Sequence, residues 1–284
     1  MQLVVNGLIY GIIVALSTMG LTITTKILDF FNFAHGSIMT VAAYLVFFFS
    51  VINGIPLIIS VLLAVVFTVI LSLILDKMIY SHMRQAESVA LLMTSVGVTF
   101  CLRSLLKVFF GSGVKGYDLP VRKAINIVGL RITVYQIIII IVSLVVMFLI
   151  HFFMTKTKIG KSMRAVADNV DLARISGIDM ERVYRWTWVL GTALAVLAGF
   201  FLALDTRLVP MMGWNILIPV FVAMVIGGIG SIYGAVIGAM IVGLSMEIAA
   251  GFIPPTYKLG ISFLMMIIVL LWRPMGIFKE SKLK

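Results

Sequence analysis

Long apolar segments separated by short polar ones make up most of this 284-residue chain. Residues 30–75 contain no Asp, Glu, Lys or Arg, and residues 208–246 form a second charge-free run. At about 1.5 Å per residue, a helix over the first run would be roughly 70 Å long, more than twice the ~30 Å hydrocarbon core of a bilayer. Each run must therefore turn, and the breaks are Asn53-Gly54-Ile55-Pro56 and Gly227-Gly228-Ile229-Gly230-Ser231.

The apolar segments predict membrane-spanning helices, because a charge at mid-bilayer costs roughly 2.5–3.5 kcal/mol and spans avoid it. We therefore expect an all-α integral membrane protein, a polytopic helical bundle of about eight to nine transmembrane helices with broken or re-entrant segments. Residues 1–284 would form a single transmembrane domain. The predicted spans are about 3–25, 36–52, 56–75, 88–106, 134–154, 184–204, 214–230, 232–251 and 257–272.

Composition excludes several other classes of protein. The chain is 62% hydrophobic and only 12% charged, with a mean hydropathy of +1.19. A water-soluble enzyme, a nucleic-acid binder or a disordered chain would need more charge and less apolar surface. Cys101 is the single cysteine, which rules out an internal disulfide. The first 25 residues have no basic cluster before the apolar stretch, so we expect the first span to be retained rather than cleaved as a signal peptide.

The net charge of +11 indicates how the chain is oriented. Basic residues concentrate in cytoplasmic loops of membrane proteins, and the segment from Thr155 to Arg185 contains seven of them. The tail from Arg273 onward is also basic, and four predicted spans separate it from that segment. Both are therefore expected on the cytoplasmic side, which places the N-terminus outside.

One basic segment conflicts with this orientation. Residues 103–131 carry six Lys and Arg against Asp118 alone, yet the span count places them outside. Two explanations stay open: a span is miscounted in the first half, or the loop is basic because an acidic partner docks there. The candidate docking residues are Arg103, Lys115, Arg122 and Lys123.

No motif for catalysis or ATP hydrolysis is present. Gly160-Lys161-Ser162 resembles the end of a phosphate-binding loop, but Thr155 stands where that loop requires glycine. His35, Asp205 and Glu247 are expected near the ends of spans, with His35 at a cytoplasmic end and Asp205 paired with Arg207. With so few ionisable groups at mid-membrane, uphill transport would need energy from a separate ATPase more than from an ion gradient.

The basic segment after Thr155 contains an amphipathic helical pattern. Its apolar positions follow i, i+3, i+4, i+7 and i+10 spacing, and its polar face is mixed in sign, which favours a protein groove over an anionic lipid surface. We expect one cytoplasmic helix, with a solvated surface helix as the alternative. The apolar positions are Met163, Val166, Ala167, Val170 and Ala173, and the polar positions are Arg164, Asp168, Asp171 and Arg174.

Four motifs in order resemble the permease subunits of branched-chain amino-acid ABC importers, in particular the shorter of the two permease types. They cover the chain from about residue 3 to residue 278. The motifs are Asn32-Phe33-Ala34-His35-Gly36, the segment from Gly160 to Gly177-Ile178, Gly227-Gly228-Ile229-Gly230-Ser231-Ile232-Tyr233-Gly234-Ala235, and Arg273-Pro274-Met275-Gly276-Ile277-Phe278.

The resemblance implies a subunit of a bacterial or archaeal cytoplasmic membrane that imports Leu, Ile, Val or a related amino acid or amide. It implies a second homologous permease, two ATP-binding subunits that use ATP and Mg, and an extracytoplasmic substrate-binding protein; lipid surrounds the chain and no nucleic acid binds. Residues 155–183 would form the coupling helix, in which Gly160, Met163, Arg164, Ala165, Val166, Asp168 and Gly177 contact an ATPase. Asn32, Phe33, His35, Gly36, Gly227, Gly228, Gly230 and Gly234 would lie beside the translocation path.

Two other functions remain as alternatives. An ion-coupled secondary transporter would work as a single chain and respond to an ionophore. A membrane-embedded enzyme or assembly factor would need a catalytic constellation, for which only His35, His82 and His151 are available. None of these histidines has an acidic partner at a motif spacing, so we expect a permease without an ATPase site of its own.

Overall fold

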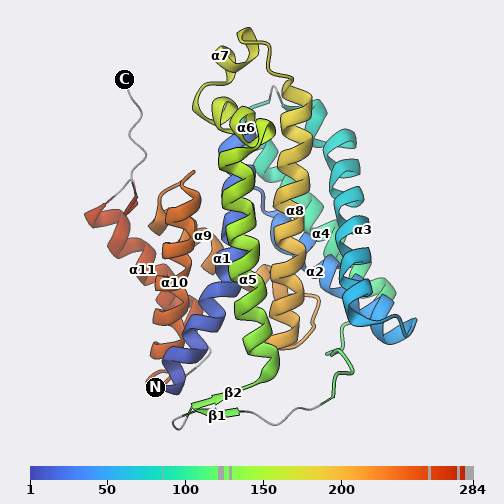
Figure 1. Ribbon diagram of the computed structural model, residues 1–284, viewed down its shortest axis with the longest axis vertical. Helices are drawn as coiled ribbons and strands as arrows, with labels where there is room; N and C mark the ends of the chain where they lie inside the picture. Colours follow the sequence, from blue (N-terminus) through green and yellow to red (C-terminus); the bar gives the residue numbers. More distant parts are fainter. Residues whose placement is uncertain (85, 121–124, 128–129, 255–256, 274–275, 279–284) are drawn as a thin grey trace.

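The computed structural model is a bundle of long helices with one short β-hairpin (Figure 1). It describes the whole chain except residues 85, 121–124, 128–129, 255–256, 274–275 and 279–284. The helices are α1 (Gln2–Leu28), α2 (Ala34–Phe47), α3 (Leu57–Met78), α4 (Ser88–Phe110), α5 (Val134–Lys156), α6 (Lys158–Asp168), α7 (Val170–Ile175), α8 (Met180–Asp205), α9 (Met212–Gly227), α10 (Ile232–Ala249) and α11 (Lys258–Trp272). A π-helical turn, Phe48–Ile52, extends α2, a 3₁₀ turn, Tyr80–Met83, follows α3, and β1 (Ile125–Ile127) pairs antiparallel with β2 (Leu130–Ile132).

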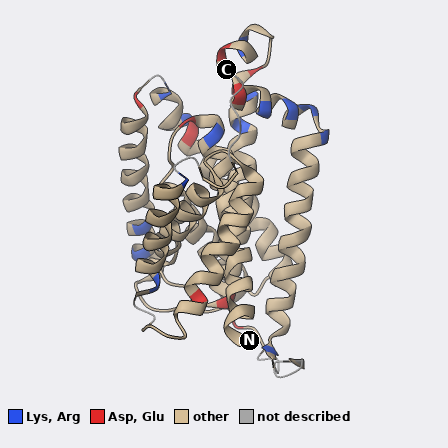
Figure 2. Cartoon of the chain, turned by 90° about the vertical axis from the view of Figure 1, so that its left-hand side faces the viewer, with Lys and Arg blue, Asp and Glu red and all other residues tan. Residues whose placement is uncertain are grey.

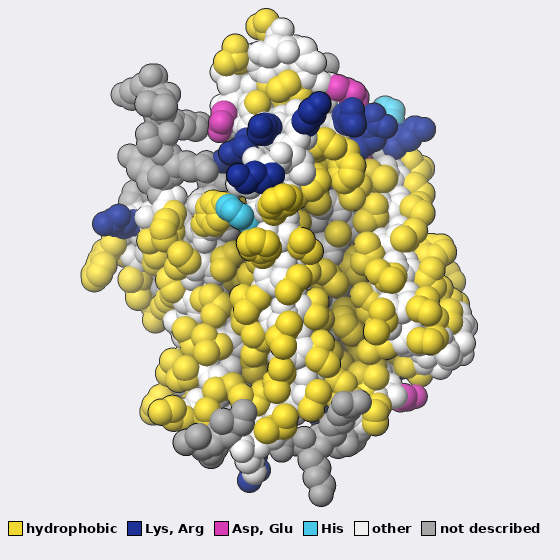
Figure 3. All heavy atoms as spheres, viewed as in Figure 1, with side chains coloured by type: hydrophobic (Ala, Val, Ile, Leu, Met, Phe, Trp, Pro, Cys, Tyr) yellow, Lys and Arg dark blue, Asp and Glu magenta, His cyan; other side chains and the backbone are white. Residues whose placement is uncertain are grey.

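The predicted spans are confirmed as helices. Among the described residues, seven helical segments are long and apolar enough to cross a membrane, while α9 and α11 are apolar but shorter. α1 and α8 are mostly buried, whereas α3 and α5 expose most of their apolar side chains. The space-filling view accordingly shows an almost wholly hydrophobic surface between the two polar ends (Figure 3). The protein is a multi-pass helical membrane protein.

The two ends of the bundle differ in what they carry. The N-terminus and the β-hairpin lie at one end, and α6 and α7 lie at the other (Figure 1). Ile277 and Phe278 return to the α6 end, because their N–H groups donate to the carbonyls of Ile226 and Gly227 at the end of α9. The turn after α9 borders the same cavity as α6. Ile277 and Phe278 therefore lie at the same end as α6, while the basic residues Lys279, Lys282 and Lys284 of the tail lie outside the described residues.

The segment between α1 and α2 re-enters the bundle. Ser88, at the start of α4, donates to the carbonyl of Asp29, and Ser95, two turns further along α4, accepts from the N–H of Phe33. The chain from Asp29 to Phe33 therefore runs inward beside α4, and α2 begins inside the bundle. The expectation that His35 lies at the cytoplasmic end of a span is wrong, since its side chain is only 2% exposed and contacts Gly20 in the interior of α1.

Glycines set the closest helix crossings. A Cβ on Gly213 of α9 would overlap the carbonyl of Gly36 on α2, and a Cβ on Gly243 of α10 would overlap the backbone of Gly11 on α1. Small residues allow backbones to approach in lipid, where dispersion replaces the hydrophobic effect as the force between helices. A Cβ on Gly238 of α10 would likewise overlap the carbonyl of Ala223 on α9, so the three contacts join α1, α2, α9 and α10 into one tightly packed centre.

Candidate functional site

The amphipathic segment after α5 forms two helices rather than the single one expected. α6 begins at Thr157, whose hydroxyl accepts from the N–H of Gly160 at 3.0 Å. It ends before Asn169, which is extended (φ −156°, ψ 109°) and whose side chain caps α7 by accepting from the N–H of Leu172 at 2.9 Å. Asn is a favoured N-cap, so a single residue both interrupts the first helix and starts the second.

The apolar side of α6 belongs to the core of the protein. Met163 is fully buried and Val166 is 1% exposed. A Cβ on Gly160 would overlap the backbone of Met154, so α6 lies directly against the end of α5. The expectation that Met163 and Val166 fill a groove on an ATPase is therefore wrong, because both side chains fill their own bundle. Ala165 is half-buried on the same helix.

A different apolar surface faces outward from α7. Leu172 is 62% exposed and Ile175 is 84% exposed, while Arg164 and Asp168 are exposed on α6. Gly177, with φ +78° and no atom near its Cβ position, turns the chain from α7 toward α8. α7 lies at the tip of this end, beyond the helices of the bundle (Figure 1). Leu172 and Ile175, the two most exposed aliphatic side chains of α7, thus lie beyond the helices of the bundle, and Val170 at the start of α7 is 38% exposed. A protein partner could bury them.

An ionic cluster that the sequence did not indicate lies at the same end. Arg84 donates to Asp76 at 2.9 Å and also pairs with Glu181 in the first turn of α8. Its guanidinium lies 4.4 Å from the centre of the Tyr184 ring, a cation–π distance. The Asp76 side chain is only 7% exposed. The one signal in the sequence is that Asp76 ends the charge-free run of residues 30–75.

The first of the four motifs, Asn32 to Gly36, lies at the centre of the bundle. Just before α2, the Asn32 side chain accepts from the N–H of Ala34 at 3.0 Å, and the ring of Phe33 lies 4.9 Å from that of Phe221 on α9. His35 is buried and its Nε2 has no hydrogen-bond partner among the described residues. Gly36 provides the crossing with Gly213 described above. The structure therefore explains Asn32 and Gly36 by local geometry and packing.

The third motif, Gly227 to Ala235, includes the turn between α9 and α10. Gly228 and Gly230 have φ values of +100° and +93°, a region that side chains disfavour. Gly227 and Gly234 are in backbone contact across the turn, and the Ser231 hydroxyl accepts from the N–H of Gly234 at 3.1 Å. Because Ile277 and Phe278 cap α9 here, the terminal motif and the glycine-rich motif form one unit.

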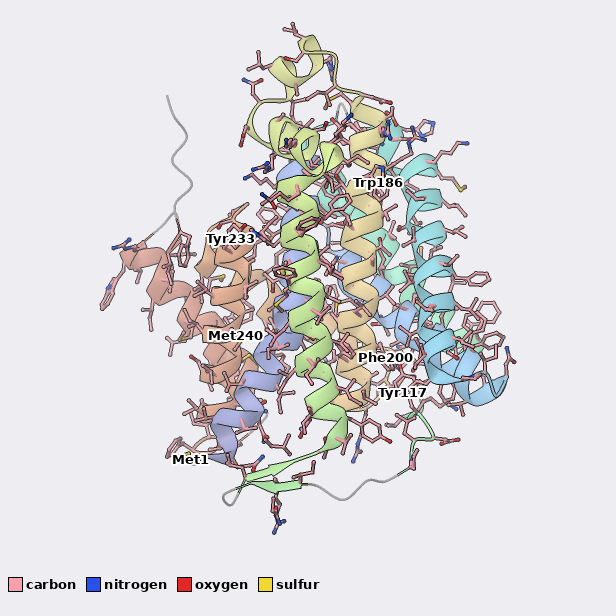
Figure 4. All side chains as sticks on the ribbon, viewed as in Figure 1. Met1, Tyr117, Trp186, Phe200, Tyr233 and Met240 are labelled. Carbon is pink, nitrogen blue, oxygen red and sulfur yellow. The ribbon has the colours of Figure 1, made fainter. Side chains whose placement is uncertain are left out.

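A cavity of about 500 Å³ lies beneath α6, between α1, α5 and α10. Its walls are mainly aliphatic, and Lys26 and Arg164 contribute basic groups. Across it, His151 Nδ1 on α5 and the Tyr233 hydroxyl on α10 are hydrogen-bonded at 2.5 Å. Tyr233 is labelled in Figure 4, on the α10 side of the gap toward α5.

At the opposite end of the bundle, the basic residues of segment 103–131 do not all lie in a loop. Arg103 lies within α4, where it donates to the sulfur of Met211 at 3.0 Å and stacks on Phe100, so it does not belong to a loop. Lys115 is in the loop, and its backbone pairs with that of Leu208. Arg122 and Lys123 lie outside the described residues.

Two acidic residues near this end have assigned partners. Asp205 accepts from Gln136 at 3.2 Å, so the expected pair with Arg207 is wrong, and Glu247 pairs with Lys258 at 2.6 Å. Within the described part of the chain, no three His, Cys, Asp or Glu side chains are grouped closely enough to hold a metal ion.

The comparisons with known proteins agree with this architecture. The family model described as branched-chain amino acid transport system / permease component matches residues 3–270. The permease protein BraD of a high-affinity branched-chain amino acid transport system in Pseudomonas aeruginosa is 29% identical, over 100% of this chain and 97% of its own length. A probable branched-chain amino acid transport permease of Methanocaldococcus jannaschii is 29% identical, over 96% of this chain and 90% of its own length.

A solved structure shares the fold. PsaBC from Streptococcus pneumoniae, in complex with Fab, aligns with a TM-score of 0.51 at 16% sequence identity, covering 95% of this chain and 90% of that one. At this identity the likeness concerns the fold alone. The full-length family match and the two full-length relatives lead to one conclusion: the chain belongs to the family of permease components of branched-chain amino acid transport systems.

Proposed function

We propose that this protein is the membrane subunit of an ATP-binding-cassette importer of Leu, Ile, Val or a related amino acid or amide, located in a bacterial or archaeal cytoplasmic membrane. The α6 end would face the cytoplasm and the N-terminus would lie outside. A second permease subunit, two ATPases that use ATP and Mg, and an extracytoplasmic binding protein would complete the system. The chain itself supplies the path and no ATPase site.

The observation that carries this proposal is the pair of exposed aliphatic side chains on α7. Leu172 and Ile175 are 62% and 84% exposed at the tip of the α6 end, where the bundle does not cover them. Burying each against a partner is worth about 1.5–3 kcal/mol. Asp168 on α6 remains a proposed polar contact to the same partner, whereas Arg164 lines the cavity beneath α6. A force on α7 would reach the bundle through Gly177 and the first turn of α8.

The test is reconstitution of the complete importer in liposomes, with leucine uptake and ATP hydrolysis measured together. Leu172→Asp combined with Ile175→Asp is expected to abolish binding of the ATPases and ATP-dependent uptake while leaving the permease folded. Phe252→Asp is the control, because Phe252 is 84% exposed in the turn after α10 at the opposite end and is not among the proposed docking residues. Equal uptake by both variants would overturn the assignment of α7.

The competing function is an ion-coupled secondary transporter. It would be supported if the single chain in liposomes accumulated leucine without ATP and lost that activity on addition of an ionophore. The structure favours the importer: the buried acid Asp76 is paired with Arg84, and Asp205 is held by Gln136, so both carboxylates have protein partners. His35 is buried against Gly20 of α1 and does not line the cavity beneath α6.

Docking of the binding protein at the opposite end is the remaining part of the proposal. Lys115, Arg122 and Lys123 are the proposed contacts, whereas Arg103 contacts its own helix and Met211. Neutralising Arg122 and Lys123 together should lower the affinity for the binding protein and its dependence on salt. Unchanged affinity would remove this surface from the proposal.

A further inference from the structure

The cavity beneath α6 has the chemistry of an amphiphile site. Its volume of about 500 Å³ falls within the roughly 300–1,000 Å³ typical of small-molecule sites. Ile150 on α5 and Val236 and Ile237 on α10 supply an aliphatic wall, and Arg164 lines the side formed by α6. An occupant with a long apolar part and an anionic end would satisfy both features.

The charges of α6 also favour an anionic ligand. The break at Asn169 separates the mixed-sign segment into two parts, and α6 keeps Lys158, Lys161 and Arg164 against Asp168 alone. Figure 2 shows these basic residues as a row across the end of the bundle. Figure 3 shows the basic side chains directly adjoining the hydrophobic surface. A basic helix at the edge of the apolar zone lies at the depth of lipid headgroups.

We propose that this cavity binds the headgroup end of one anionic phospholipid from the membrane leaflet at the α6 end, with the phosphate at Arg164 and the acyl chains leaving the cavity between α5 and α10. The hydrogen-bonded pair of His151 and Tyr233 joins these two helices across the site and offers further polar contacts to the glycerol region. Bound in this position, the lipid fills the space under α6 and links α5 to α10.

A transported amino acid fits this cavity less well. Among the described lining residues, Lys26, His151 and Arg164 are the ionisable side chains besides Tyr233, with no Asp or Glu, so the lining offers charged partners to an anion and no carboxylate to an ammonium group. An anionic lipid needs only the basic side. The lining therefore distinguishes the two classes of ligand by charge.

The test is native mass spectrometry of the full-length chain purified in detergent with equal amounts of phosphatidylglycerol and phosphatidylethanolamine. The wild type is expected to retain one phosphatidylglycerol per chain. Arg164→Gln should reduce retention about tenfold or more, as loss of a charged hydrogen bond does. Ile237→Trp, which fills the cavity from its edge, should also lose the lipid.

Matched controls separate the site from the general annulus of lipid. Arg164→Lys should keep most of the retention, and Arg182→Gln removes another exposed charge, from the start of α8, at a residue that does not line the cavity. Ile267→Trp adds the same bulk to the exposed face of α11, where Ile267 is 51% exposed. Equal retention in Arg164→Gln and Arg182→Gln, equal retention of both lipids, or displacement of the lipid by leucine would each overturn the proposal.

Discussion

Removing the charge of Arg84 should destabilise the protein far more than removing that of Glu181, although both belong to the same cluster. Arg84 connects Asp76, near the end of α3, with Glu181, at the start of α8. The Asp76 side chain is 7% exposed, whereas that of Glu181 is 65% exposed. The two ion pairs therefore differ in the solvent that remains available to each carboxylate.

The magnitudes follow from that difference in burial. Arg84→Met leaves a buried carboxylate without its counter-charge, which costs about 3–5 kcal/mol. Glu181→Gln breaks a largely solvated pair, worth about 0–1 kcal/mol. Adding Asp76→Asn to Arg84→Met removes the uncompensated charge and should recover most of the loss. The double-mutant cycle then isolates the coupling between Asp76 and Arg84.

Thermal unfolding of the purified chain in detergent micelles measures these differences. Trp188 is a suitable fluorescent reporter, because its ring lies 5.1 Å from that of Tyr80 in the turn that precedes Arg84. The expected order of stability is wild type, then Glu181→Gln, then the double variant, with Arg84→Met least stable. Equal losses for Arg84→Met and Glu181→Gln, or a double variant worse than Arg84→Met, would refute the reasoning from burial.

Three further outcomes are expected from particular residues. Gly213→Val should lower the free energy of unfolding by about 1–3 kcal/mol or more, because the new Cβ overlaps the carbonyl of Gly36. Gly97→Ala, at an open site on α4, should leave that free energy unchanged or slightly raised, and thermal unfolding compares the two variants. Tyr117→Phe should lose about 0.5–1.5 kcal/mol with its hydrogen bond to α2. Burial raises the pKa of Tyr117 above its ordinary value of 10.0, so the stability that the neutral hydroxyl provides is fully present below pH 10 and is lost as the pH rises above that value. Alkaline unfolding of the wild type and of Tyr117→Phe will check this dependence. Asn169→Ala should cost about 1 kcal/mol and speed hydrogen exchange in α7, whereas Asn169→Asp, which keeps the cap, should not.

The sequence predicted the spans and their grouping well because both depend on strong, local terms. A charge-free run longer than a bilayer is thick must turn, and the turns occur at the glycine- and proline-containing breaks that were expected. The even number of helices from α8 to α11 returns the C-terminal segment to the α6 end for the same reason. Helical periodicity also identified Met163 and Val166 correctly as one apolar face.

What that face contacts depended on tertiary structure and was predicted wrongly. Periodicity shows that Met163 and Val166 need an apolar neighbour, and it does not show whether the neighbour is the same chain or a partner. The depth of His35 was missed for a similar reason. Asp29 to Phe33 descend beside α4 through hydrogen bonds to Ser88 and Ser95, which lie about 60 residues away in sequence.

The packing of the helices indicates how a displacement of α7 would be transmitted through the bundle. At the crossings of Gly36 with Gly213 and Gly11 with Gly243, the helix backbones are in direct contact, so α1, α2, α9 and α10 have little room to slide past one another. α7 touches the rest of the chain less, and it continues through Gly177 into α8, whose first turn Arg84 ties to α3. If the ATPases of the proposed importer move α7, the displacement passes to α8 and, through the close contacts of Gly191 with Gly20 on α1 and of Gly199 with Met39 on α2, directly to the central helices. Coupling of this kind requires rigid shifts of whole helices, because the glycine crossings allow no gradual bending between them.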